Sequence, residues 1–154
     1  MGDDVVDGTP LTPVDTAWLH MEDPTNLMMV TGIYVFEGPV DFARLKETVK
    51  LRMVERFPRL KHRVASGSVG ARWVADPKFD LDAHVHRIAL PSPGDGRALR
   101  DTVSDLMSMP LDFTKPLWQL HLLERYGEGS VVLLRLHHCI GDGVALVHVL
   151  LSST

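Results

Sequence analysis

The residues best suited to chemistry in this 154-residue chain are two adjacent histidines, His137 and His138. An imidazole titrates near neutral pH, so it can take a proton from a hydroxyl group and deliver one to a leaving group. The sequence Gly141-Asp142-Gly143 follows shortly after, and its glycines permit a tight turn or a close approach of substrate. Asp142 could orient an imidazole, pair with an arginine or cap a helix.

The two histidines end an apolar segment, residues 130–138, that is predicted to be a β-strand. Successive side chains of a strand point to opposite faces. His138 should therefore share a face with Leu136, and His137 should share the other face with Arg135. Because the two rings diverge, no metal site is expected, since a metal needs ligands that converge. Taken alone, such a pair is also compatible with a purely structural role.

Composition limits the class of protein. Hydrophobic residues make up 45% and charged residues 23%, as in an ordinary soluble globular domain. The formal net charge of −4 lacks the basic footprint of a nucleic-acid-binding protein. One cysteine, Cys139, allows no internal disulfide and suits a reducing cytoplasm. No apolar run approaches the roughly 20 residues that span a bilayer, so any membrane contact is expected to be peripheral.

Hydrophobic periodicity predicts an α/β fold, with a mixed sheet flanked by helices. No glycine-rich nucleotide-binding motif is present in the sequence. Helices are expected around residues 17–19, 41–57 and 97–109, and from about Asp142 onward. Strands are expected at residues 28–36 (a buried strand), 84–90, 117–123 and 130–138, with a hairpin made of 61–65 and 71–75.

The other histidines and the tryptophans have simpler expected roles. The histidines are scattered, and each is expected on the surface or in a satisfied structural position: His20, His62, His84, His86, His121 and His148. The tryptophans are expected to anchor the core: Trp18, Trp73 and Trp118.

Three ordered segments resemble the bacterial wax ester synthase/diacylglycerol acyltransferase family. The sequence H-H-C-I-G-D-G at residues 137–143 matches the H-H-x-x-x-D-G pattern of the coenzyme A-dependent acyltransferase superfamily. That superfamily also includes chloramphenicol acetyltransferases and peptide condensation domains. P-L-T-P-V-D-T-A-W-L-H-M-E at residues 10–22 is similar to the family's N-terminal signature, and P-L-W-Q at residues 116–119 is similar to its Pro-Leu-Trp motif. Gln119 departs from the Glu that is common at that position.

The resemblance implies a chloramphenicol acetyltransferase-like fold of two lobes, of which this chain is the N-terminal lobe. Residues 1–9 would form a flexible N-terminus, and residues 10–154 the lobe that carries the histidine motif. The C-terminal lobe would be absent from this chain and would act as its partner, as a second lobe or a second chain. The implied location is cytoplasmic, at the periphery of a membrane or a lipid droplet.

The implied activity is transfer of a long-chain acyl group from acyl-CoA to the hydroxyl of a diacylglycerol or of a fatty alcohol. The resemblance makes His138 the general base, with His137 supporting it and Asp142 orienting the loop. No cofactor is implied, because acyl-CoA is a substrate, and no metal. Contacts to substrate are expected from four further residues: Pro116, Leu117, Trp118 and Gly143.

Two other classes of function stay open. One is a condensation-type acyltransferase that uses carrier-bound thioesters. The other is a non-catalytic lobe that binds lipid or a partner. Within the acyltransferase hypothesis, the sequence does not choose between diacylglycerol and fatty alcohol as the acceptor.

Overall fold

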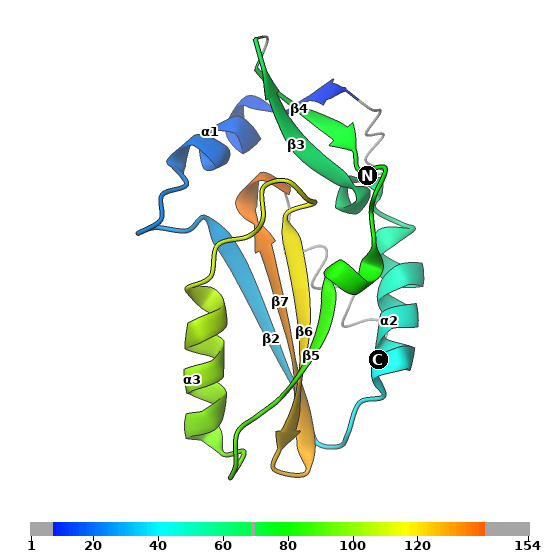
Figure 1. The fold of residues 1–154 in the computed structure, drawn as a ribbon, viewed down its shortest axis with the longest axis vertical. Helices are drawn as coiled ribbons and strands as arrows, with labels where there is room; N and C mark the ends of the chain where they lie inside the picture. The colour runs from blue at the N-terminus through cyan, green and yellow to red at the C-terminus, as the bar shows by residue number, and fades with distance from the viewer. Residues whose placement is uncertain (1–7, 69, 141–154) are drawn as a thin grey trace.

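The computed structural model describes residues 8–68 and 70–140 and builds them around a four-stranded sheet (Figure 1). β7 (Gly129–His137) runs antiparallel to both of its neighbours in the sheet. β5 (Val85–Ala89) is parallel to β6 (Trp118–Tyr126). The sheet is therefore mixed, as the sequence predicts. Its strand order is β2 (Met29–Phe36), β7, β6 and β5.

A smaller sheet lies beyond the end of the large one, where β2 begins and β7 ends (Figure 1). Its strands, in spatial order, are β1 (Thr9–Pro10), β4 (Gly70–Ala75) and β3 (His62–Gly67). The predicted hairpin is thus confirmed as β3 and β4. Residues 1–7 of the segment expected to be flexible lie outside the described residues, whereas Thr9 pairs with Trp73.

Side-chain oxygens begin each of the three predicted helices that lie within the described residues. Thr12 caps α1 (Pro13–Met21) by accepting the Asp15 N–H at 3.1 Å, which satisfies one of the free amides of the first turn. Asp41 and Asp95 do the same for α2 (Phe42–Val49) and α3 (Gly96–Met107). Helix α2 continues as a π-helical segment, Lys50–Val54. Short 3-10 helices are η2 (Pro58–Lys61), η3 (Leu81–Ala83) and η4 (His138–Ile140).

The two faces of the large sheet are covered by different helices. One face packs under α2 and its π-helical extension, where Leu134 and Met53 belong to one buried cluster. The other face packs under α3, where Leu133 and Leu106 belong to a second cluster. The alternation of β7 side chains between these clusters follows from the two-residue period of a strand.

The strand expected at residues 28–36 is confirmed as β2, but the expectation that it is buried is wrong. β2 is an edge strand, and Ile33 and Val35 are 46% and 62% exposed. They share the face of the sheet that α3 covers, but the apolar side chains of α3 pack over β5, β6 and β7. Apolar composition alone therefore did not reveal which strand lies at the edge.

The expectation that the last strand includes His138 is also wrong. β7 ends at His137, which pairs with Met29, the first residue of β2. The His138 N–H donates instead to the Met28 carbonyl at 3.0 Å, and η4 begins there. The alternation argument therefore holds for His137 and Arg135 but does not place the His138 ring. The helix expected from Asp142 lies outside the described residues.

Candidate active site

His137 is held on both edges of its ring by the protein itself. Its side chain is 1% exposed, and its Nδ1 accepts a hydrogen bond from the Cys139 backbone N–H at 3.0 Å. Because that nitrogen accepts, the ring proton lies on Nε2, which donates to Oε1 of Glu22 at 3.2 Å. Neither nitrogen is left for a substrate.

The same contacts fix the charge of His137. Burial lowers the pKa of the imidazole, and the nearby Glu22 carboxylate opposes only part of that effect. A neutral ring is also what the Cys139 N–H requires, because a protonated imidazole has no acceptor. The contacts of His137 are therefore those of a neutral imidazole that joins Glu22 to the backbone of Cys139.

His138 has a different environment. It is half-buried at the start of η4, and its ring stacks on the indole of Trp18 with centroids 4.3 Å apart and an interplanar angle of 17°. Among the described residues, none forms a hydrogen bond with its ring nitrogens. Stacking on Trp18 covers one face of the imidazole and leaves its edge without a hydrogen-bond partner within the described residues.

Both partners of the two histidines come from α1, which lies across the end of the large sheet (Figure 1). Trp18 stands one helical turn before Glu22, and residues four apart lie on the same side of a helix. After Glu22, Asp23 and Asn26 pair through their backbones and reverse the chain. The reversal brings the Met28 N–H to Oε1 of Glu22 at 2.6 Å.

The sequence did not identify this role of α1. Trp18 was expected in the core, but it is half-buried and packs on an imidazole. Glu22 had no individual expected role. A usable signal was present, because both residues fall in the N-terminal signature at 10–22 with helical i, i+4 spacing.

The Pro-Leu-Trp segment supports the histidines from the strand next to them. The Leu117 carbonyl accepts the His137 N–H at 3.0 Å. The Trp118 indole is fully buried, stacks on His84 and donates its Nε1–H to the Leu60 carbonyl at 2.9 Å. Pro116 and Leu117 are buried too. A direct contact of these side chains with substrate stays a prediction.

Arg59 holds the backbone that follows the histidines. Its guanidinium donates to the Ile140 carbonyl at 3.1 Å and lies over the Trp73 ring, 5.1 Å from its centroid. The carbonyl that it binds belongs to the last described residue before Gly141. Asp142 and Gly143 themselves lie outside the described residues, so their predicted roles stay predictions.

One expectation about the scattered histidines is wrong. His121 is 6% exposed, and within residues 8–68 and 70–140 neither of its ring nitrogens has a hydrogen-bond partner. Burial, together with the positive charge of Arg135, lowers its pKa to about 4. It is therefore a buried but unsatisfied histidine. In contrast, His84 and His62 are satisfied, since each donates its Nδ1–H to a backbone carbonyl.

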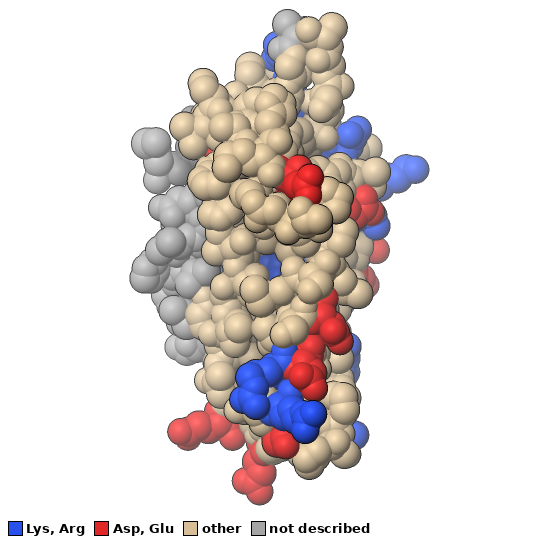
Figure 2. Space-filling view, turned by 90° about the vertical axis from the view of Figure 1, so that its left-hand side faces the viewer, with Lys and Arg blue, Asp and Glu red and all other residues tan. Residues whose placement is uncertain are grey.

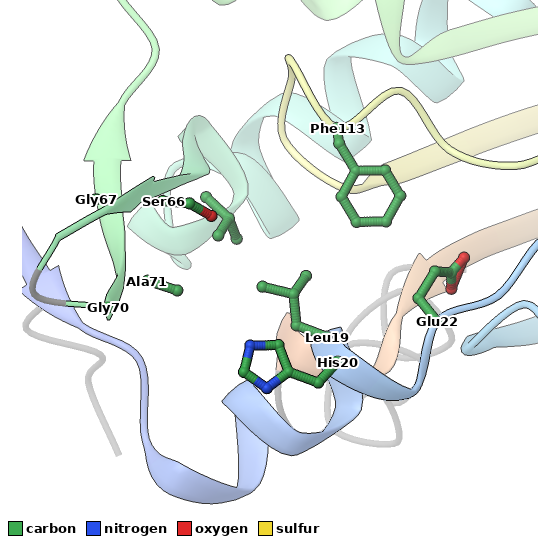
Figure 3. A pocket seen from close by; sticks show the side chains of 9 residues that line it. Leu19, His20, Glu22, Ser66, Gly67, Gly70, Ala71 and Phe113 are labelled. Carbon is green, nitrogen blue, oxygen red and sulfur yellow. The ribbon is translucent and has the colours of Figure 1, made fainter.

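A cavity of about 580 Å³ opens between α1 and the hairpin of β3 and β4 (Figure 3). Leu19, His20 and Glu22 line it from α1, and Phe113 lines it from the loop after α3. The carboxylate that holds His137 thus borders open space.

Two negative findings apply to the described part of the chain. It contains no group of three His, Cys, Asp or Glu side chains placed to hold a metal ion. None of its helices has both the length and the apolar character needed to cross a membrane.

The fold and the histidine site define a class of protein. The wax ester synthase/diacylglycerol acyltransferase from Marinobacter aquaeolei VT8 superimposes with a TM-score of 0.75 at 30% identity, over 91% of this chain and 37% of that one. The starter condensation domain of rhizomide synthetase RzmA has the same fold, with a TM-score of 0.73 at 17% identity over 94% of this chain and 36% of that one. The chain therefore has the fold of the N-terminal lobe of the two-lobed CoA-dependent acyltransferases.

The family follows from the sequence comparisons. The profile of the wax ester synthase/diacylglycerol acyltransferase catalytic domain matches residues 11–153. The probable diacylglycerol O-acyltransferase tgs1 of Mycobacterium tuberculosis is 37% identical over 147 residues, or 91% of this chain and 32% of that protein. Its tgs3 counterpart is 31% identical over 156 residues, or 95% of this chain and 57% of that protein. The chain belongs to the wax ester synthase/diacylglycerol acyltransferase family. It spans about a third of the length of tgs1 and somewhat more than half of tgs3.

Proposed function

We propose that this chain is the histidine-bearing lobe of an O-acyltransferase that moves a long-chain acyl group from acyl-CoA to a lipid hydroxyl. The acceptor is a diacylglycerol, giving triacylglycerol, or a fatty alcohol, giving a wax ester. The observation that carries the proposal is the family match over residues 11–153, which contains the complete H-H-x-x-x-D-G motif. The names of the relatives, diacylglycerol O-acyltransferase and wax ester synthase, support the two acceptor classes.

In the proposed reaction His138 is the general base. Its ring nitrogen takes the proton of the acceptor hydroxyl as the oxygen attacks the thioester carbonyl. The tetrahedral intermediate collapses, the carbon–sulfur bond breaks, and the proton passes from the imidazole to the sulfur of CoA. The products are the ester and free CoA, and no acyl-enzyme is needed. Support for choosing His138 comes from its available ring edge, because both nitrogens of His137 are occupied.

The neighbouring motif residues have supporting roles in this proposal. His137 fixes the end of β7 and the start of η4 through its two ring hydrogen bonds. Asp142 orients the following loop, and Gly143 allows substrate to approach the backbone, as the resemblance implies. The Pro-Leu-Trp segment holds the His137 backbone through the Leu117 carbonyl.

The proposal also includes a second lobe as partner and a peripheral position at a membrane or lipid-droplet surface. On the side of the molecule that carries α3, charged side chains gather at the lower end and along one edge, and the middle of the face is mostly uncharged (Figure 2). Apolar side chains at the C-terminal end of α1, at that of α3 and in the loop after α3 are exposed: Met21 is 55%, Met107 47%, Met109 53% and Phe113 38% exposed. Exposed apolar residues grouped in this way commonly mark an interface or a lipid-binding surface.

The test uses the complete polypeptide that carries these 154 residues. Labelled long-chain acyl-CoA is incubated with a diacylglycerol, with a fatty alcohol, or with a carrier-bound acyl thioester in place of acyl-CoA. Ester formation from acyl-CoA that is lost in His138→Ala, by roughly 10² to 10⁴ in rate, supports the proposal. Turnover only from the carrier-bound donor would overturn it, as would lipid binding without any turnover.

A further inference from the structure

We propose that Glu22 is a positioning residue for His138, acting through His137 and the backbone of Met28. This inference rests on the proposed function, since it assigns to His138 the role of base. Glu22 ends α1 as its C-cap, and its carboxylate lies beside the end of β7. It does not contact the His138 ring, so its effect on the reaction is indirect.

The geometry that supports this role is a closed circuit of hydrogen bonds. Oε1 of Glu22 accepts the Met28 N–H at 2.6 Å and the Nε2–H of His137 at 3.2 Å. The Met28 carbonyl then accepts the His138 N–H at 3.0 Å. The peptide bond between His137 and His138 closes the circuit. One carboxylate oxygen thus joins the His137 side chain to the Met28 backbone, whose carbonyl in turn accepts the His138 N–H.

The local environment makes these bonds stiff. The side chains of Glu22 and His137 are 14% and 1% exposed, so the hydrogen bond between them is mostly shielded from water although Glu22 also lines the cavity beside α1. A base works only if its nitrogen is within hydrogen-bond reach of the substrate hydroxyl, and a displacement of about 1 Å can cost roughly 100-fold in rate.

Three substitutions of Glu22 distinguish the effect of where its side-chain oxygen lies from the effect of its negative charge. Glu22→Gln keeps a carbonyl oxygen at the same reach but removes the charge, so we expect kcat within about threefold of the parent. Glu22→Asp keeps the charge but shortens the side chain by one methylene, and Glu22→Ala removes the oxygen. For both we expect kcat to fall roughly 10- to 100-fold, while the KM for acyl-CoA changes less than about threefold. Glu128→Gln, in the exposed turn between β6 and β7, is the matched control.

The measurements are kcat and KM in the complete polypeptide, with circular dichroism to show that each variant is folded at the assay temperature. A merely structural role predicts that loss of activity follows loss of folded protein, with kcat per folded molecule unchanged. Folded Glu22→Asp with parental kcat overturns the inference. Glu22→Gln as slow as Glu22→Asp overturns it too, because charge would then matter rather than position. If Glu22→Ala does not fold, Glu22→Asp and Glu22→Gln still test whether Glu22 positions His138.

His138→Ala in the same assay separates this inference from the proposed function. No turnover by the parent protein with any acceptor means that the proposed function has failed. An active parent, an inactive His138→Ala and a fully active Glu22→Asp mean that only the role of Glu22 has failed.

Discussion

The imidazole of His138 lies nearly flat against the indole of Trp18, with ring centroids 4.3 Å apart and an interplanar angle of 17°. These residues are 120 positions apart in the sequence and come from α1 and η4. The stacking holds the ring by its face, so that in the proposed reaction its edge would meet the acceptor hydroxyl group. A flat aromatic contact of this kind contributes about 0.5–1.5 kcal/mol beyond the area that it buries.

Loss of this contact should slow the reaction without abolishing it. In Trp18→Leu we expect kcat to fall about tenfold, because the His138 ring gains rotational freedom, whereas Trp18→Phe keeps a stacking face and most of the activity. Val14→Ala, at a 66% exposed position of the same helix, is the control. Steady-state kinetics on folded variants provide the measurement. Parental kcat in Trp18→Leu would show that the stacking has no part in catalysis.

Substitutions of the two adjacent histidines should affect different properties. His137→Ala should mainly lower the stability, and His138→Ala should mainly lower the turnover. His137→Ala removes the acceptor of the Cys139 N–H and one donor to the Glu22 carboxylate, so we expect the free energy of unfolding to fall by about 2–3 kcal/mol. His138→Ala removes a half-buried ring and should cost no more than about 1.5 kcal/mol. Urea unfolding gives both values, and acyl transfer is assayed in parallel.

A particular combination of results would contradict this division of roles. If His137→Ala unfolds at the parental urea concentration and yet loses turnover more completely than His138→Ala, then His137 is the base. The hydrogen bonds that occupy both of its nitrogens would in that case have to open during the reaction.

The sequence predicted most of the fold because the main elements carry local signals. The caps Thr12 and Asp41 and the apolar runs of β6 and β7 are all readable from neighbouring residues. The end of β7 was not readable, because it depends on where its partner β2 begins. A β-ladder ends where the neighbouring strand ends, and the sequence of β7 alone does not indicate where β2 begins.

The candidate site was predicted only in part for the same reason. The H-H-x-x-x-D-G motif identified His138, but the partners of the motif, Trp18 and Glu22, lie more than 110 residues before it. Packing between distant segments brings them together, and local periodicity cannot show this. His121 is a similar case, since a strand position does not reveal whether a buried ring finds a hydrogen-bond partner.

The buried His121 should make stability depend on pH below neutrality. Its pKa falls from 6.5 to about 4 in the folded protein, because burial and then the charge of Arg135 disfavour the protonated ring. Between these two pH values the unfolded chain binds a proton that the folded chain does not. The free energy of unfolding therefore drops as pH falls from 6.5 towards 4, by on the order of 3 kcal/mol in total.

Urea unfolding at several pH values between 4 and 7.5 measures this dependence. His121→Leu should flatten it, and it should also unfold at higher urea, because it removes two buried polar atoms without partners in the described structure. His20→Leu, at an exposed position of α1, is the control for replacing a histidine by leucine. An unchanged slope in His121→Leu would assign the pH dependence to other groups.

Cys139 should be unreactive in the folded chain even though it sits between the candidate base and the glycines of the motif. Burial, followed by the negative charge of Asp15, raises the pKa of its thiol to about 12. The thiolate is the nucleophile, so the reactive fraction at pH 8 is very small. We expect iodoacetamide at pH 8 to leave Cys139 unmodified in native protein and to alkylate it fully in guanidinium chloride, as measured by mass spectrometry. Rapid native alkylation would mean that η4 opens readily.

The 154 residues should not catalyse acyl transfer by themselves. The proposed base lies on a single lobe, and exposed apolar residues such as Met109 and Phe113 in the loop after α3 need a covering surface. A stable contact between lobes of this kind buries roughly 2,000 Å² or more. We therefore expect residues 1–154 alone to associate or to bind detergent, with turnover below detection. The complete polypeptide should be active in the same assay. Analytical ultracentrifugation and the labelled acyl-CoA assay test both points, and a monodisperse monomer of residues 1–154 that forms ester would disprove the need for a second lobe.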